Sequence, residues 1–143
     1  MRQVCWRWAL VALLGLCQLA CSSKDKLNPV QGKVLHQNQP LAGALVAFHP
    51  DGPADINVQN PVGLTKEDGT FQLTTGQDDG ARAGIYTVTI ICSEIPQNAK
   101  KTFSTGGVDS VDRLKGAYAN VDASKIKVEI KPGRNELEPF DLK

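Results

Sequence analysis

Beyond Pro29 the chain consists of short apolar runs with a period of two residues, separated by clusters of turn residues. This pattern constrains the fold most, because such alternation is typical of strands that bury one face. No segment of this region shows the 3.6-residue period of an amphipathic helix. There are about seven such runs over roughly 115 residues. A single sheet would leave one apolar face in water, so the pattern predicts an all-β sandwich of two sheets.

The runs define the core and the order of strands. The run 84–92 is apolar on both faces, which predicts a central strand in which Cys92 is a buried thiol. The pair Asp68-Gly69 predicts a hairpin between runs at 62–65 and 70–74, because glycine tolerates a positive φ. The predicted core positions are Val30, Val34, Ala44, Val46, Phe48, Phe71, Leu73, Tyr86, Val88, Ile90, Cys92, Ile126, Val128, Ile130, Phe140 and Leu142.

The first twenty residues have the three zones of an export signal. Residues 1–7 are basic, Trp8–Leu19 is apolar, and small residues follow at 20–23. As a helix the apolar zone would be about 18 Å long, short of the roughly 30 Å of a hydrocarbon core. The sequence therefore predicts a signal peptide at 1–20 rather than a membrane-spanning anchor, and hence an exported protein.

Removal of the signal changes the charge and the cysteine content. The remaining chain holds 14 Lys or Arg against 15 Asp or Glu, since Arg2 and Arg7 leave with the signal. A net charge near −1 offers no basic surface for nucleic acid. Only Cys21 and Cys92 remain, so a disulfide framework is excluded.

Small residues surround a cysteine where the apolar zone ends. The sequence Ala20-Cys21-Ser22 resembles the lipobox of bacterial lipoproteins, although Gln18 stands where that family usually has leucine. The resemblance implies cleavage before Cys21 and attachment of acyl chains, palmitate among them, to this residue. It also implies anchoring in the cell membrane or an outer membrane, with the domain in the periplasm or outside the cell.

Two alternatives remain for Cys21. An ordinary signal cleavage near Ala20 would leave it as a free thiol, and it could instead pair with Cys92. A reactive thiol at an exported N-terminus is a liability, which favours its capping by lipid. Cys17 is a poorer lipidation site, because Leu16 is large for the position before the cysteine. Residues 21–29 would then form a short tether.

The body of the chain carries several motifs of glycines, turn residues and core positions. They are Val30–Val34, Pro40–Ala44, Val46–Phe48, Thr65–Phe71, Gly84–Val88, Tyr118–Asn120, Ser124–Ile130 and Gly133–Leu142. Together these segments resemble carboxypeptidase regulatory-like, or transthyretin-like, domains of small bacterial lipoproteins. The resemblance implies a seven-stranded Ig-like or prealbumin-like sandwich over residues 30–143, and a non-catalytic accessory module without a cofactor. Such motifs specify a fold, not a ligand.

The residues that could carry chemistry do not form a recognised constellation. The two histidines, His36 and His49, are predicted at strand ends without the spacing of a zinc site. Asp78 and Asp79 are the calcium candidates, although their segment is more simply a turn before the long strand. The chain has no GxSxG, GxGxxG or phosphate-binding loop. We therefore expect no enzyme, and a protein-interaction or structural module instead.

Two long loops interrupt the strand pattern, at 50–61 and 93–115. Long loops without secondary structure are often functional or disordered, so 93–115 is either a partner-binding loop or a passive one. Lys100, Lys101 and Phe103 are its candidate contact residues. The alternative function is carbohydrate binding, for which Phe103 and Tyr118 are the aromatic residues not required by the core.

Overall fold

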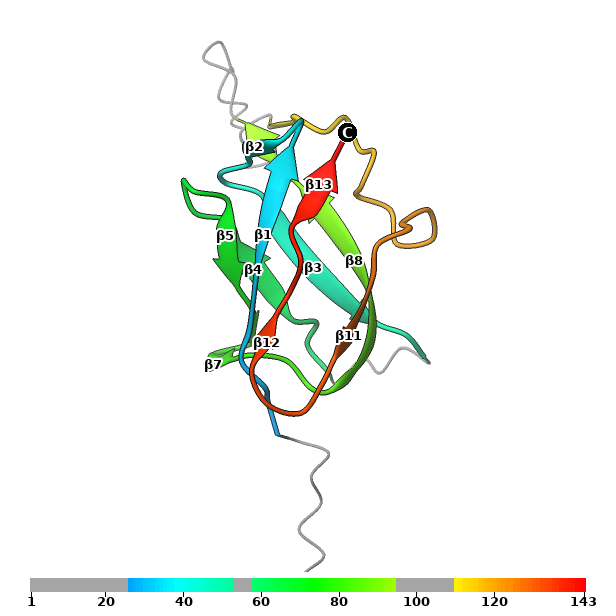
Figure 1. Cartoon of the computed structure of the whole chain (residues 1–143). Helices are drawn as coiled ribbons and strands as arrows, with labels where there is room; N and C mark the ends of the chain where they lie inside the picture. Colours follow the sequence, from blue (N-terminus) through cyan, green and yellow to red (C-terminus); the bar gives the residue numbers. More distant parts are fainter. Residues whose placement is uncertain (1–25, 53–57, 95–109) are drawn as a thin grey trace, which may run out of the picture.

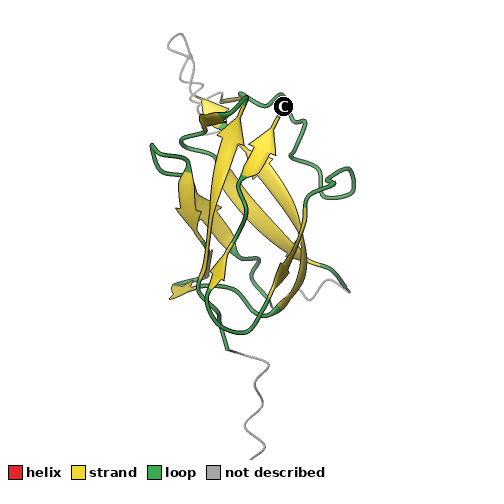
Figure 2. Ribbon diagram, viewed as in Figure 1, coloured by secondary structure: helices red, strands yellow, loops and turns green. Residues whose placement is uncertain are grey.

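The computed structural model describes residues 26–52, 58–94 and 110–143. Within these ranges every regular element is a strand, and the strands form two facing layers (Figures 1 and 2). The predicted all-β, sandwich-like architecture is therefore confirmed.

The first layer is a five-stranded sheet built around β1. Its strands are β1 (Val30–His36), β2 (Gln39–Pro40), β5 (Thr70–Gln72), β12 (Asn135–Glu136) and β13 (Phe140–Leu142). The strands β12 and β13 pair with β1 in parallel, whereas β2 and β5 pair with it in antiparallel orientation. Residues 137–139 separate β12 from β13, and Pro139 in this segment cannot donate a ladder hydrogen bond.

The second layer is a six-stranded sheet in the order β11-β8-β3-β4-β6-β7. Its strands are β3 (Leu45–Pro50), β4 (Val62–Leu64), β6 (Thr74–Thr75), β7 (Asp78–Asp79), β8 (Gly84–Ile91) and β11 (Lys127–Ile130). All its pairings are antiparallel. The strand β8 lies between β3 and β11, so the prediction of a central strand is confirmed. A short pair, β9 (Ser93–Glu94) with β10 (Val111–Asp112), follows β8.

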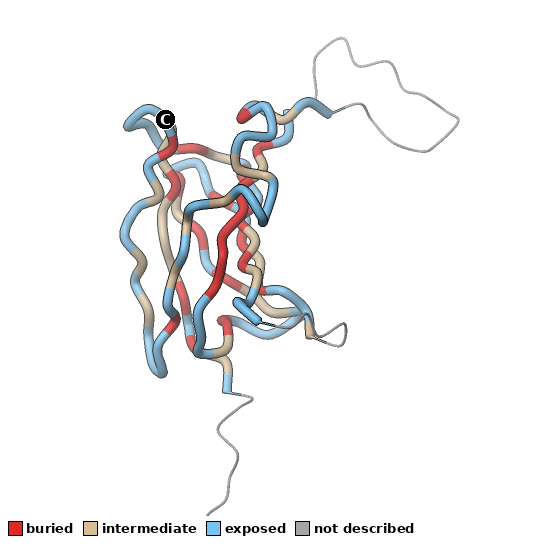
Figure 3. The backbone as a smooth tube through the Cα atoms, turned by 90° about the vertical axis from the view of Figure 1, so that its right-hand side faces the viewer, coloured by how far each residue is buried: buried red, intermediate tan, exposed pale blue. Residues whose placement is uncertain are grey.

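The core lies between the two sheets and contains the predicted alternating positions, together with Leu41, Ala81 and Leu114, which were not predicted. Figure 3 shows buried residues recurring along the strands of both layers. Val34, Val46, Phe48, Val88 and Ile90 are fully buried. Ile126, Val128 and Phe140 are partly buried and pack against this cluster. The period-two alternation therefore identified the inner face of every long strand.

The predicted hairpin at Asp68-Gly69 differs from the observed connection. The tight turn is present, because Gly69 has φ +77° and its N–H donates to the Lys66 carbonyl over 2.9 Å. The flanking strands, however, belong to different sheets: β4 pairs with β3 and β6, whereas β5 pairs with β1. The turn therefore moves the chain from one layer to the other.

The strand count also differs from the prediction, with thirteen strands in the described residues rather than seven runs. Predicted runs divide where the chain changes partner: 70–74 becomes β5 and part of β6, with Leu73 donating to the Val30 carbonyl between them. The predicted turn at 77–80 instead contains a short strand, because Asp78 and Asp79 pair with Thr75 and Thr74 to form a small hairpin.

The N-terminal side of the sandwich is fixed by Asn28. This buried residue forms an isolated antiparallel bridge with Ala81, with N···O distances of 2.7 and 3.0 Å. Its side-chain oxygen accepts a 2.8 Å hydrogen bond from the N–H of Gly133. Figure 1 shows that the chain leaves the sandwich here, at the end opposite the C-terminus.

Candidate functional site

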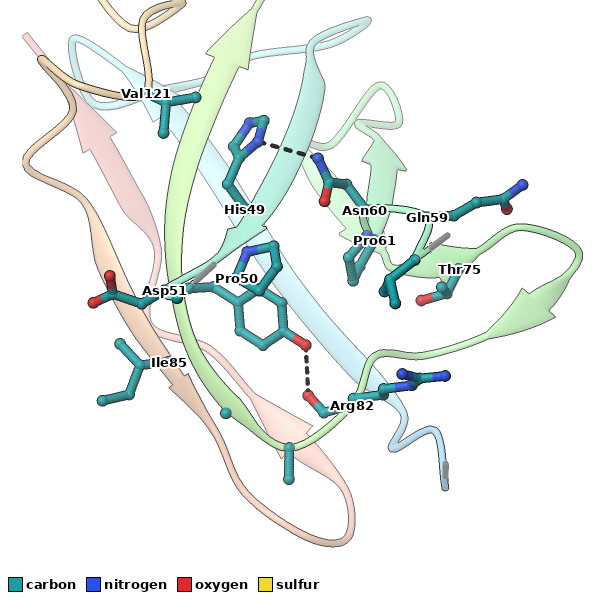
Figure 4. A pocket seen from close by; sticks show the side chains of 15 residues that line it. His49, Pro50, Asp51, Gln59, Asn60, Pro61, Thr75, Arg82, Ile85 and Val121 are labelled. Atoms are coloured by element: carbon teal, nitrogen blue, oxygen red, sulfur yellow. Dashed lines mark hydrogen bonds between the residues drawn. The ribbon is translucent and has the colours of Figure 1, made fainter. Parts of the chain in front are cut away.

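A cleft with a volume of ≈ 760 Å³ lies where β3 ends and β8 begins. The loops that follow β3 and precede β8 form its two sides, as Figure 4 shows. The lining residues that carry polar side chains are His49, Asp51, Gln59, Asn60, Thr75, Arg82 and Tyr86. The apolar part of the lining comes mainly from Pro50, Val58, Pro61, Ile85 and Val121.

His49 is held at the edge of this cleft by a hydrogen bond at each ring nitrogen. The amide Nδ2 of Asn60 lies 3.2 Å from Nδ1, and Thr89 Oγ1 lies 2.9 Å from Nε2. Because an amide NH₂ group can only donate, Nδ1 is the acceptor and the ring proton is on Nε2. Partial burial also lowers the pKa of His49 below its ordinary value. The amide donor at Nδ1 and the partial burial therefore both favour the neutral form of the imidazole.

The neutral state of His49 predicts a pH-dependent stability. The pKa of this ring is lower in the folded chain than in the unfolded chain, so the unfolded chain binds more protons as the solution is acidified. The contribution of His49 is complete above the unfolded pKa of about 6.5 and is lost as the pH falls through the folded pKa. We expect the free energy of unfolding, measured by urea titration at a series of pH values, to decrease across this window.

The matched variants are His49→Gln and His36→Gln, since His36 is the other histidine and ends β1 away from the cleft. His49→Gln should reduce the decrease in the free energy of unfolding across this pH window. His36→Gln should leave that decrease unchanged. A profile that is equally steep in His49→Gln and in the natural protein would contradict the assignment.

The one aromatic residue of the cleft lining belongs to the core. Tyr86 is only 5% exposed, and its ring lies edge-on to Phe48 with a centroid distance of 5.9 Å. Its hydroxyl donates to the carbonyl of Arg82 over 2.9 Å, and burial raises the pKa of this phenol. The tyrosine thus fixes the loop before β8 and offers the cleft no free ring face for stacking.

The outward surface of the second sheet adjoins the cleft through His49 and Ile85. We use the name outer face for the outward side chains of β3, β4 and β8, which are Leu45, Ala47, His49, Val62, Leu64, Ile85, Thr87, Thr89 and Ile91. The register places Leu64, Leu45 and Ile91 side by side across the three strands. Leu45, Leu64 and Ile85 are the exposed members of this face, whereas Thr87 and Thr89 are buried.

The opposite end of the sandwich is organised by Asp112. Its Oδ1 accepts hydrogen bonds of 3.0 Å from the N–H groups of Cys92 and Leu114, and its Oδ2 accepts one of 2.8 Å from Gly116. Burial acts to raise the pKa of this carboxyl, but the three N–H donors outweigh it and lower the pKa overall. Asp112 therefore joins the turn after β10 to the end of β8.

The residues predicted as candidates fall into two groups. Asp78 and Asp79 are exposed on β7, and the described part of the chain contains no group of three or more His, Cys, Asp or Glu side chains placed to hold a metal. Cys92 is a free, buried cysteine, as predicted. Cys21, Lys100, Lys101 and Phe103 lie outside the described residues.

The sequence did not reveal the cleft as a site. The loop 50–61 was the only signal, because it interrupts the strand pattern beside His49. Asn60 and Arg82 come from separate loops, and Val121 approaches from a third segment. Only the pairing of β3 with β8 brings these positions together.

Comparison with known proteins identifies no family for the chain. A scan against known protein families finds no match, and no curated protein sequence matches. Among solved structures, the chain is similar to a DUF3823 family protein from Parabacteroides merdae ATCC 43184, with 16% identity and a TM-score of 0.40 over 81% of this chain and 45% of that one. It is also similar to a 9R-lipoxygenase from Cyanothece PCC8801, with 14% identity and a TM-score of 0.43 over 81% and 16% of the two chains.

The chain thus spans less than half the length of each of these two proteins. Residues 26–52, 58–94 and 110–143 include no helix that could cross a membrane.

Proposed function

We propose that this protein is a cell-envelope lipoprotein, exported by residues 1–20 and anchored through acyl chains on Cys21. Its body is a transthyretin-like sandwich that acts as a non-catalytic protein-interaction module. The two sheets, with their buried alternating faces and a central β8, support this fold type.

The observation that carries the proposal is the position of the chain at Asn28. Cys21 precedes Lys26, the first described residue, by only five positions, which span at most about 18 Å when extended. Asn28 then ties the chain to Ala81 and Gly133. A lipid on Cys21 would therefore hold the N-terminal end of the sandwich close to the bilayer, with β2, β9 and β10 directed away from it.

A non-catalytic role is supported by how the polar side chains are used. Both ring nitrogens of His49 are engaged by neighbouring side chains, and the carboxylate of Asp112 accepts three backbone N–H groups. The side-chain amide of Asn28 likewise bonds to the backbone of Lys26, Ala81 and Gly133. These groups stabilise the fold, and their hydrogen-bonding capacity is already occupied.

Contact with protein rather than with carbohydrate is supported by the surfaces of the sandwich. Sugar binding usually relies on exposed aromatic faces, whereas the candidate Tyr118 is partly buried against the core and the ring of Tyr86 packs against Phe48. The outer face instead presents exposed aliphatic side chains such as Leu45 and Leu64. Contiguous apolar surface of this kind marks protein-binding sites.

The test is the intact mass of the protein purified from the membranes of cells that process lipoproteins. We expect the mass of residues 21–143 plus a diacylglyceryl group, with or without a further acyl chain. The unmodified mass of residues 21–143, or of any chain cut at another position, would overturn the anchor.

A further inference from the structure

We propose that Asp51-Gly52, at the rim of the cleft (Figure 4), is a site of spontaneous isoaspartate formation in the folded protein. The sequence contains three Asp-Gly pairs, at 51–52, 68–69 and 79–80. Glycine after aspartate favours this reaction, because the missing side chain leaves its backbone nitrogen open to the aspartyl carboxyl group. The structure divides the three pairs into two that are held in place and one that is open.

The reaction needs no partner other than water. The nitrogen of Gly52 attacks Cγ of Asp51, an N–Cγ bond forms, and the carboxyl OH leaves with the amide proton as water. Hydrolysis of the resulting five-membered succinimide takes up one water again. Opening at the Cγ carbonyl restores aspartate, whereas opening at the main-chain carbonyl gives isoaspartate, in which the main chain runs through Cβ and Cγ. The mass of the chain is therefore unchanged.

Two of the pairs are held in place by their glycines. The N–H of Gly69 donates to the Lys66 carbonyl over 2.9 Å. The N–H of Gly80 donates to the Leu73 carbonyl over 2.7 Å. Both glycines also lie so close to neighbouring backbone that an added Cβ would collide with a carbonyl oxygen. Attack by either nitrogen therefore requires local opening of the fold.

The aspartates of these two pairs are restrained as well. The Oδ1 atom of Asp68 accepts a 3.0 Å hydrogen bond from the N–H of Thr70 and a 2.6 Å hydrogen bond from its hydroxyl. Asp79 is part of β7, where it pairs with Thr74. Closure of a succinimide ring at either pair would break these interactions.

The pair Asp51-Gly52 lacks such restraints. It directly follows β3, and the N–H of Gly52 makes no hydrogen bond within the described part of the chain. An added Cβ on Gly52 would meet no atom of the described residues within 4 Å. Asp51 forms a 3.1 Å ion pair with Lys127, but both side chains are half-exposed, and exposed pairs are weak. The carboxyl group of Asp51 can therefore turn toward the nitrogen of Gly52 without disturbing either sheet.

The product would alter the rim of the cleft. The isoaspartyl link lengthens the main chain by a methylene group and places the carboxylate on Cα. The carboxylate of Asp51 joins the loop after β3 to the edge strand β11 through Lys127, while its N–H donates to the Ile85 carbonyl over 2.8 Å. Isomerisation displaces the carboxylate from Lys127 and shifts the start of the loop that forms one side of the cleft.

The test is incubation of the purified protein at neutral pH and physiological temperature, followed by peptide mapping with fragmentation that distinguishes isoaspartate from aspartate. We expect isoaspartate to accumulate at Asp51 at least about tenfold faster than at Asp68 or Asp79, because the two held pairs must first open locally. The control is the same protein unfolded in urea. There the three pairs should react at similar rates, since only the shared Asp-Gly sequence then decides.

The matched variants are Asp51→Asn, Asp68→Asn and Asp79→Asn, which close the same ring with loss of ammonia and report the reaction as a mass increase. Only Asp51→Asn should react quickly when folded, and circular dichroism verifies the fold of each variant. Similar rates at the three pairs in the folded protein, or isoaspartate at Asp51 in urea alone, would refute the proposal. Isomerisation leaves the intact mass unchanged, so this outcome is independent of the lipid anchor.

Discussion

Replacement of Cys21 by serine should move the protein from the membrane fraction to the soluble fraction almost completely. A serine oxygen does not accept the thioether-linked lipid, and each buried methylene contributes about 0.8 kcal/mol to membrane binding. Two or more acyl chains therefore anchor firmly, whereas their loss leaves a chain with no other proposed attachment. Fractionation of cells followed by immunoblotting measures the change.

The control for this experiment is Cys17→Ser. Cys17 lies four residues earlier, inside the proposed signal, and Leu16 before it does not suit the processing peptidase. This variant should be processed and should stay in the membrane fraction. Retention of Cys21→Ser in membranes after a high-salt wash would contradict lipid anchoring at Cys21, whatever the outcome for Cys17.

The inner faces of the strands were predictable because they depend on local alternation. In β8, the predicted inner positions Val88 and Ile90 are fully buried. Thr87 and Thr89 on the other face are buried too, as expected of a central strand. The turn at Asp68-Gly69 was also predictable from local sequence, because it requires a positive φ, which glycine adopts without steric cost. Patterns within a few residues specify these features completely.

Features that depend on distant partners were not predictable. The strand β5 follows the Gly69 turn directly, yet it pairs with β1, about forty residues earlier, rather than with β4. The carboxylate of Asp112 accepts one of its hydrogen bonds from the N–H of Cys92, which lies twenty residues away in the sequence. The cleft likewise depends on the register of β3 with β8, which no single segment encodes.

Replacement of Phe48 by alanine should destabilise the sandwich more than any other single truncation discussed above. Phe48 is fully buried on β3. Its ring lies 6.4 Å from Phe71 and 6.5 Å from Phe140 in the first sheet, and 5.9 Å from Tyr86 in the second. The side chain therefore joins the two layers, and its removal leaves a cavity that the surrounding rings cannot fill without moving apart.

Truncation of a buried phenylalanine to alanine costs about 3–5 kcal/mol, a large share of the 5–15 kcal/mol that stabilises a typical domain. Urea unfolding monitored by circular dichroism measures the loss. Ile85→Ala is the matched control: Ile85 is on the neighbouring strand but half exposed, so its truncation should change the free energy of unfolding by no more than about 0.5 kcal/mol. Equal losses in the two variants would mean that the core is not centred on Phe48. In that case the assignment of Leu45 and Leu64 to the outer face would fail with it, because they alternate with the core positions through the same registers.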